Sequence, residues 1–191
     1  RAQARIPQRT GCGGARIAAA PLGPRAEHTR GIGERYMVTI SAQELKGELA
    51  GGRAGLIDSA LAGTLDSQGL RSAMTELYDL VLGRLATRAG IVPGSGYALC
   101  AFGGLGRREM LPYSDLDLVL LYDGGRAANL QETADALWYP LWDSGLSIDH
   151  SVRTPEQCLT LAAEDPKVAL SMLELRHIAG DPALYEKAAS G

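Results

Sequence analysis

Apolar residues recur at steps of three and four along residues 68–88, and this period predicts an amphipathic helix. The residues that set the period are Leu70, Met74, Leu77, Val81 and Leu85. Further helices are expected where end caps or the same period occur. They are a short helix from the capping box Ser41–Glu44, one over 131–142, one from the Thr154 N-cap, one over about 166–179, and one that starts at Asp181-Pro182.

Three short apolar runs predict β-strands, over residues 97–102, 115–122 and 146–152. Glycines follow the first two runs, and residues 107–110 are expected to form one helical turn. The order of these elements is helix, strand, strand, helix, strand and further helices. This order predicts an α+β or α/β protein with a small sheet.

Composition narrows the class of protein. The chain has 191 residues, of which 46% are hydrophobic and 21% charged, with a formal net charge of −3. These values are ordinary for a globular protein and point to neither nucleic acid nor a membrane as a partner. No stretch approaches the roughly 18 to 20 apolar residues that a membrane helix needs. Cys12, Cys100 and Cys158 form no C-x-x-C pair, which fits a reducing, cytoplasmic compartment.

The first 36 residues differ from the rest. They hold seven Arg and two Glu, a net charge of +5, whereas the other 155 residues carry −8. The segment is rich in Gly, Ala and Pro and lacks the continuous apolar run of a secretory signal. We therefore expect residues 1–36 to be a disordered or artefactual extension, with the folded part starting near Met37. A basic arm that binds nucleic acid is the alternative.

The candidate functional residues are two glycines that follow the first predicted strand and two aspartates at the start of the second. Asp115 and Asp117 are two residues apart, so their carboxylates leave the same face of a strand, about 7 Å apart at the backbone. Such a pair repels itself unless a cation joins it, and oxygen ligands suit Mg²⁺. After Gly103-Gly104, backbone N–H groups can approach a polyphosphate.

Each piece of this pattern is weak alone, since D-x-D pairs also occur at solvated strand ends. Gly104 and Gly106 lack the third glycine of a dinucleotide fingerprint, and the chain has no P-loop Gly-Lys-Ser/Thr. The combination of strand, paired glycines, a ten-residue interval and an alternating acidic strand is more specific. It predicts a metal–phosphate site.

The same pattern carries a family resemblance. Phe102-Gly103-Gly104, ten residues and then Asp115-Leu-Asp-Leu118 resembles the signature of DNA polymerase β-like nucleotidyltransferases. The full run 103–118 is similar to one branch, the bifunctional uridylyltransferase/uridylyl-removing enzymes that act on the PII nitrogen-signalling protein. Segments 150–154 and 173–185 support this branch, and the resemblance spans about residues 70–187.

The resemblance implies an α+β core with a small mixed sheet flanked by helices, over residues 37–153, and the start of a helical region over 154–191. It also implies Mg²⁺ (or Mn²⁺) as cofactor and transfer of UMP from UTP to a tyrosine of PII, with release of pyrophosphate. The implied metal ligands and catalytic residues are Asp115 and Asp117, with Asp149 as a third candidate for which a surface role is equally open. The implied nucleotide-binding residues are Gly103, Gly104, Ser114 and Arg107, although Ser114 could instead cap its loop and Arg107 could pair with Glu109 or another acid.

Other readings stay open beside this one. Arg outnumbers Lys 16 to 3, which hints at a GC-rich genome, and some actinobacterial relatives transfer AMP to PII from ATP. A related enzyme with another target, or a non-catalytic nucleotide-binding module of the same fold, are further alternatives. The family's hydrolase and glutamine-sensing domains have no counterpart in these residues, so the chain is expected to be an N-terminal fragment.

Overall fold

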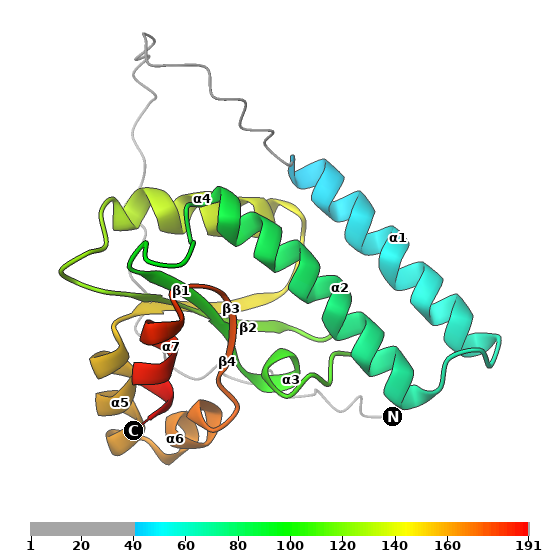
Figure 1. Ribbon diagram of the computed structural model, residues 1–191. Helices are drawn as coiled ribbons and strands as arrows, with labels where there is room; N and C mark the ends of the chain where they lie inside the picture. Colours follow the sequence, from blue (N-terminus) through cyan, green and yellow to red (C-terminus); the bar gives the residue numbers. More distant parts are fainter. Residues whose placement is uncertain (1–40, 191) are drawn as a thin grey trace, which may run out of the picture. The chain divides into compact units, whose positions relative to one another are not determined.

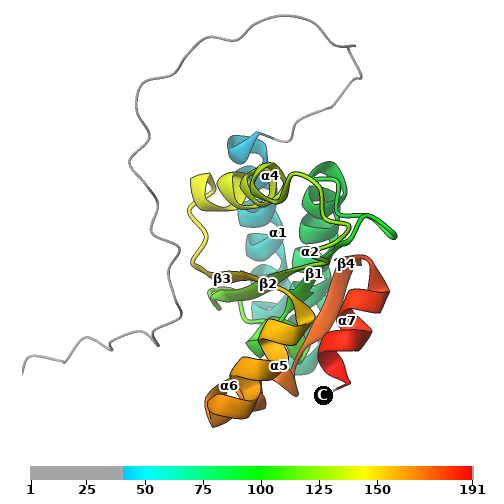
Figure 2. The same ribbon diagram turned by 90° about the vertical axis from the view of Figure 1, so that its left-hand side faces the viewer.

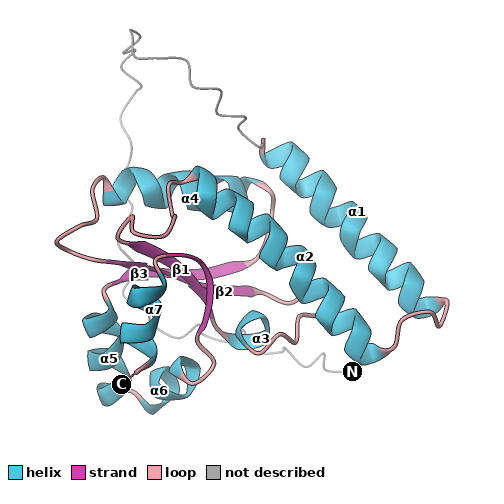
Figure 3. Cartoon of the chain, viewed as in Figure 1, coloured by secondary structure: helices cyan, strands magenta, loops and turns pink. Residues whose placement is uncertain are grey.

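The computed structural model describes residues 41–190; the predicted boundary near Met37 and the extension over 1–36 lie outside this range. Helices and strands are interspersed through the described part (Figures 1 and 3). The elements are α1 (Ala42–Leu61), α2 (Ser67–Arg88), β1 (Tyr97–Ala101), α3 (Gly103–Gly106), β2 (Leu116–Tyr122), α4 (Leu130–Asp143), β3 (Ile148–Arg153), α5 (Pro155–Glu164), α6 (Pro166–Met172), β4 (Arg176–Gly180) and α7 (Pro182–Ala189).

The four strands form one sheet in the order β3-β2-β1-β4. Strand β1 runs antiparallel to both β2 and β4, whereas β2 and β3 are parallel. The sheet is therefore mixed, and the α+β class with a small mixed sheet flanked by helices is confirmed. None of the helices in this part of the chain combines the length and the apolar character that crossing a bilayer requires.

Helices cover both faces of the sheet, with α1, α2 and α4 on one side and α5 and α7 on the other (Figure 2). Strand β2 serves both sides. Its residues Leu116, Leu118 and Leu120 join the core under α2 and α4, whereas Val119 and Leu121 join the smaller core with α5 and α7. Alternation along a strand therefore puts Asp117 on the α5/α7 face, beyond the apolar residues.

Local signals explain where the helices begin. In α1 the Ser41 hydroxyl accepts a hydrogen bond from the Glu44 N–H (3.2 Å) and the Glu44 carboxylate accepts one from the Ser41 N–H (2.8 Å). The helix is longer than expected and continues through four glycines. Gly52 packs against α2 so closely that a Cβ would lie 2.8 Å from the Leu77 side chain. The glycine there allows α1 and α2 to approach each other.

Two helical predictions are wrong. The expected helix over 166–179 ends at Met172, and residues 176–180 form β4 instead, because they pair with the otherwise open edge of β1. The expected turn over 107–110 is replaced by α3 at the glycines themselves. Arg108 has φ 60°, a left-handed conformation that no helix continues through.

Candidate functional site

Three aspartates lie near the points where β2 and β3 begin. Asp117 lies on β2, Asp115 directly precedes this strand, and Asp149 is the direct neighbour of Asp117 in the parallel pairing of β2 with β3. Asp115 and Asp149 are exposed, whereas Asp117 is partly buried. The fold thus brings the two predicted catalytic aspartates and the tentative third one to the same end of the sheet, at the N-terminal ends of β2 and β3.

The surroundings of Asp117 at this end of the sheet disfavour the charged form of its carboxyl. Burial raises the pKa of its carboxyl, and the negative charges of Asp149 and Asp115 raise it further. A bound cation would relieve both effects, because it compensates the lost hydration and screens the repulsion. Among residues 41–190 no group of three or more His, Cys, Asp or Glu side chains is gathered closely enough to hold a metal ion.

The turn after β1 fits against Asp117. Phe102 N–H donates a hydrogen bond to the Asp117 carbonyl (2.9 Å), so the pairing of β1 and β2 extends to this point. The next residue, Gly103, turns the chain with φ 55°. A Cβ on Gly103 would overlap the Asp117 carboxylate oxygen Oδ2. Both the backbone angle and the contact therefore call for glycine at this position.

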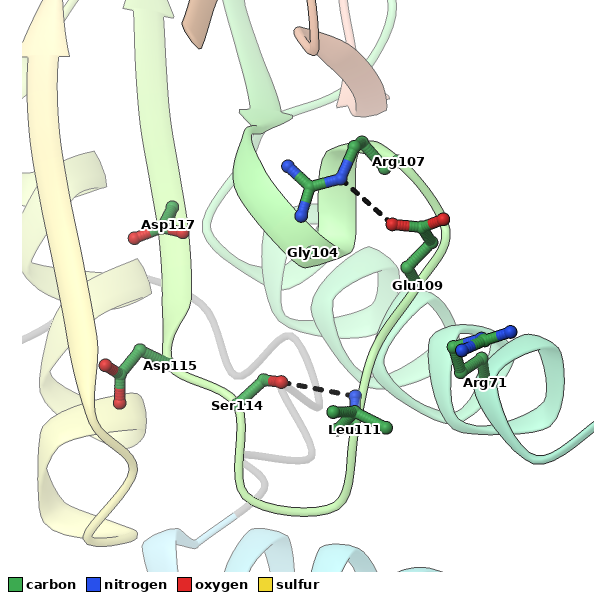
Figure 4. A pocket seen from close by; sticks show the side chains of 8 residues that line it. All are labelled: Arg71, Gly104, Arg107, Glu109, Leu111, Ser114, Asp115 and Asp117. Carbon is green, nitrogen blue, oxygen red and sulfur yellow. Dashed lines mark hydrogen bonds and ion pairs between the residues drawn. The ribbon is translucent and has the colours of Figure 1, made fainter. Parts of the chain in front are cut away.

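A cavity of about 450 Å³ opens beside α3 and the start of β2 (Figure 4). Asp115 and Asp117 stand on one side of it, Gly104 lies on α3, and Arg71 comes from α2 on the far side. The lining residues are Arg71, Gly104, Arg107, Glu109, Leu111, Ser114, Asp115 and Asp117. Of the residues predicted for the site, all but Gly103 and Asp149 line this cavity, and those two adjoin Asp117.

Two predicted nucleotide ligands already have partners in the protein. The Arg107 guanidinium pairs with Glu109 (3.0 Å) and Glu174 (2.7 Å), and these hydrogen bonds raise its pKa. The Ser114 hydroxyl accepts a hydrogen bond from the Leu111 N–H (3.2 Å), which closes the turn before β2. The ion-pair and loop-capping alternatives are thus both present in the structure, and Ser114 keeps its hydroxyl proton to donate.

An arginine that the sequence interpretation missed holds α3 in place. Arg176 on β4 donates to the Leu105 carbonyl through Nε (3.0 Å) and Nη2 (2.7 Å). Asp79 on α2 accepts from Nη1 (3.0 Å) and Nη2 (2.8 Å) of the same guanidinium. No local signal marks these residues, since they lie 97 positions apart in sequence.

Arg71 was also missed, but the sequence contains a signal for it. It lies four residues before Thr75 and seven before Tyr78, both of which are buried. An arginine at this helical spacing faces inward with them. Thr75 in turn accepts a hydrogen bond from the Met110 N–H (3.4 Å), so this face of α2 contacts the connection between α3 and β2.

Comparison with known families decides what kind of domain this is. Residues 53–147, which include α3, β2 and the cavity, match the family described as "Putative nucleotidyltransferase DUF294". The chain carries a DUF294 nucleotidyltransferase domain. The predicted relationship to the nucleotidyltransferases is thereby confirmed, and the cavity lies within the matched residues.

Curated relatives of this nucleotidyltransferase domain have one name in common. A bifunctional uridylyltransferase/uridylyl-removing enzyme of Mycobacterium tuberculosis (strain ATCC 25618 / H37Rv) is 53% identical over 120 residues, which are 63% of this chain and 15% of that protein. Its namesake from Streptomyces coelicolor is 49% identical over 111 residues, 58% of this chain and 13% of the relative. The chain thus spans about one seventh of the length of these relatives.

Proposed function

We propose that this domain transfers UMP from UTP to a tyrosine hydroxyl of the PII nitrogen-regulatory protein, with Mg²⁺ (or Mn²⁺) bound at Asp115 and Asp117. The tyrosine oxygen forms a bond to the α-phosphorus and loses its proton, and the bond from that phosphorus to the leaving pyrophosphate breaks. The observation that carries the proposal is the contact of Gly103 with Asp117, which joins a glycine turn to an acidic strand end.

The carboxylates fit a divalent ion that shares its shell with the substrate. Mg²⁺ takes one or two protein carboxylates and completes its coordination with water and phosphate oxygens, so a third protein ligand is not required. Burial and the neighbouring carboxylates raise the pKa of Asp117, and a cation bound at the pair would compensate both effects. When bound, the ion neutralises phosphate charge and helps to align the attack. Asp149 stands beside the pair, as a third ligand or as an acceptor for the tyrosine proton.

The start of α3 fits the phosphates. The first N–H groups of a helix lack acceptors within the helix. In α1, α2 and α5 a Ser, Asp or Thr side chain supplies one, whereas Phe102 makes no side-chain cap hydrogen bond at α3. The amides of the Gly103–Gly104 turn, beside the cavity, are therefore the donors we assign to the triphosphate.

The identity of the nucleotide and of the target rests on the relatives. The names of these relatives contain uridylyltransferase, and this favours UTP for the present domain. The carboxylates and glycines contact phosphates in this scheme, so they do not distinguish the base. ATP therefore enters the test as the second nucleotide.

The test offers α-labelled UTP and ATP separately to the 191-residue chain, with PII and Mg²⁺, and follows label on PII. Label from UTP that disappears in Asp117→Asn supports the proposal. Label from ATP alone keeps the mechanism and changes the product to an adenylylated protein. Nucleotide binding without label on PII would contradict transfer and favour a regulatory module.

A matched control is Asp165→Asn. Asp165 is an exposed aspartate that caps the start of α6, and it does not line the cavity. It removes the same charge as Asp117→Asn. Label on PII is expected to persist in this variant. Its loss would mean that the assay responds to charge or folding rather than to the proposed ligand.

A further inference from the structure

Arg71 has more hydrogen-bonding capacity than its surroundings use. Its Nη2 donates to the Gln68 side-chain oxygen (3.1 Å), a neutral partner one turn earlier in α2. Its Nε is buried and has no hydrogen-bond partner. Within residues 41–190 no carboxylate forms an ion pair with it. A buried guanidinium N–H without an acceptor is costly unless a ligand supplies one.

The other cation on the cavity differs in this respect. Arg107 is held by Glu109 and Glu174, so its charge is compensated inside the protein. Arg71 is thus the lining cation whose charge is uncompensated among the described residues. Because the remaining charged lining residues are carboxylates, an anion that enters the cavity finds its free partner at Arg71.

The position of Arg71 relates it to one end of the nucleotide. Asp115 and Asp117 stand on one side of the cavity, Gly104 lies between, and Arg71 is on the far side (Figure 4). A divalent ion at the carboxylates would compensate only part of the negative charge of a triphosphate, so a further cation at the terminal phosphate is favourable. Guanidinium groups suit that end, since they offer paired donors to phosphate oxygens.

We propose that Arg71 binds the terminal phosphate of the nucleoside triphosphate and thereby makes the domain prefer a triphosphate to a diphosphate. This inference rests on the proposed function, because it takes the cavity as the nucleotide site. It goes further by assigning to a residue of α2 the discrimination between nucleotides with three and with two phosphates. The acidic strand and the glycine turn bind nucleotides of either length.

The test measures the affinity of the 191-residue chain for UTP and UDP, and for ATP and ADP, by calorimetry in Mg²⁺. We expect Arg71→Ala to weaken binding of the preferred triphosphate about tenfold or more, and that of its diphosphate less than twofold. Arg71→Lys, which keeps the charge but not the fork, is expected to recover part of the preference. Arg71→Gln serves as a second neutral variant of similar length.

Arg88→Ala is the matched control. Arg88 belongs to the same helix and also has a buried nitrogen without a partner, Nη1, but it lies outside the cavity. It should leave the ratio of triphosphate to diphosphate affinity unchanged. An unchanged ratio in folded Arg71→Ala or Arg71→Gln would overturn the inference while the proposed function stands. If the unaltered chain binds neither UTP nor ATP, the proposed function itself fails.

Discussion

The α-carbon of Gly103 lies against the carboxylate of Asp117, so the turn after β1 and the acidic end of β2 fit together when residue 103 has no side chain. The same glycine has φ 55°, which side-chain-bearing residues rarely adopt. One residue therefore meets two requirements, the sharp turn into α3 and the room for Asp117. Its neighbour Gly104 meets neither, because a Cβ there would lie 3.6 Å from the nearest atom, an ordinary contact.

Gly103→Ala and Gly104→Ala should consequently differ in stability. We expect Gly103→Ala to lower the free energy of unfolding by about 2 kcal/mol, through the strained φ and the overlap with Asp117. Gly104→Ala should change it by less than about 0.5 kcal/mol. Urea denaturation followed by circular dichroism measures both. Equal losses in the two variants would show that the contact with Asp117 is not what selects glycine.

Asp117→Asn should separate stability from activity. Burial and two neighbouring carboxylates raise the pKa of Asp117, so its negative charge costs the folded protein stability relative to the unfolded chain. An amide removes that charge and keeps the shape. Without metal, the melting temperature at pH 7 is therefore expected to be equal to or higher than that of the unaltered chain, while nucleotidyl transfer is lost. A clear drop in melting temperature would contradict the assigned repulsion.

Added Mg²⁺ and nucleoside triphosphate provide the complementary measurement. A ligand that binds the folded state raises the melting temperature by mass action. We expect an increase for the unaltered chain, and little or none for Asp117→Asn, in a thermal-shift titration. A similar increase in both would place the nucleotide somewhere other than at the carboxylates.

Arg176→Ala should loosen α3 as well as the sheet. The Arg176 side chain is 16% exposed, and its guanidinium donates to both the Leu105 carbonyl and Asp79, so its removal leaves two acceptors without their donor. We expect a loss of about 2 kcal/mol in stability and faster amide exchange over residues 103–107. Lys187→Ala is the control, since the pair of Lys187 with Glu156 is exposed and should contribute nothing measurable.

The two cysteines of the described part should resist alkylation. Cys100 on β1 and Cys158 on α5 are buried free thiols, and burial raises the pKa of both. Since the thiolate is the reactive form, we expect slow iodoacetamide labelling that accelerates on unfolding. The experiment uses a Cys12→Ser background, because Cys12 lies outside the described residues. Rapid labelling of either thiol in the native protein would contradict its burial.

Elements with local signals were predictable from the sequence. The period of α2, the capping boxes at Ser41 and Thr154 and the alternation of β2 depend on residues close together in the chain. Strand β4 was not predictable in this way. Its residues resemble a helix continuation, and they become a strand because β1, some 80 residues earlier, offers an edge to pair with.

The site residues likewise divide into those with a local sequence signal and those brought together by tertiary packing. The Gly103–Asp117 interval is short, so its residues are visible as one pattern, and their convergence on one cavity agrees with it. The roles assigned to them stay predictions. Arg71 lines the cavity from α2, and its helical spacing to the buried Thr75 and Tyr78 was a sequence signal. Arg176 contacts α3 from β4, and only tertiary packing brings it there. The sequence predicts that Arg107 could pair with Glu109 or another acid. It does not identify Glu174, which follows α6 and reaches Arg107 only in the folded chain.

Strand β2 carries apolar residues toward two cores and its acidic residues toward one edge, with a neighbouring strand on each side. A slip of one residue in its pairing would turn Asp117 under α2 and α4 and expel Leu116 and Leu118 from their core. Errors in assembling the site are therefore errors in assembling the whole domain. A molecule with a misaligned acidic pair would therefore also lack a stable core. In a cell, such chains would be handled by chaperones and proteases as unfolded protein.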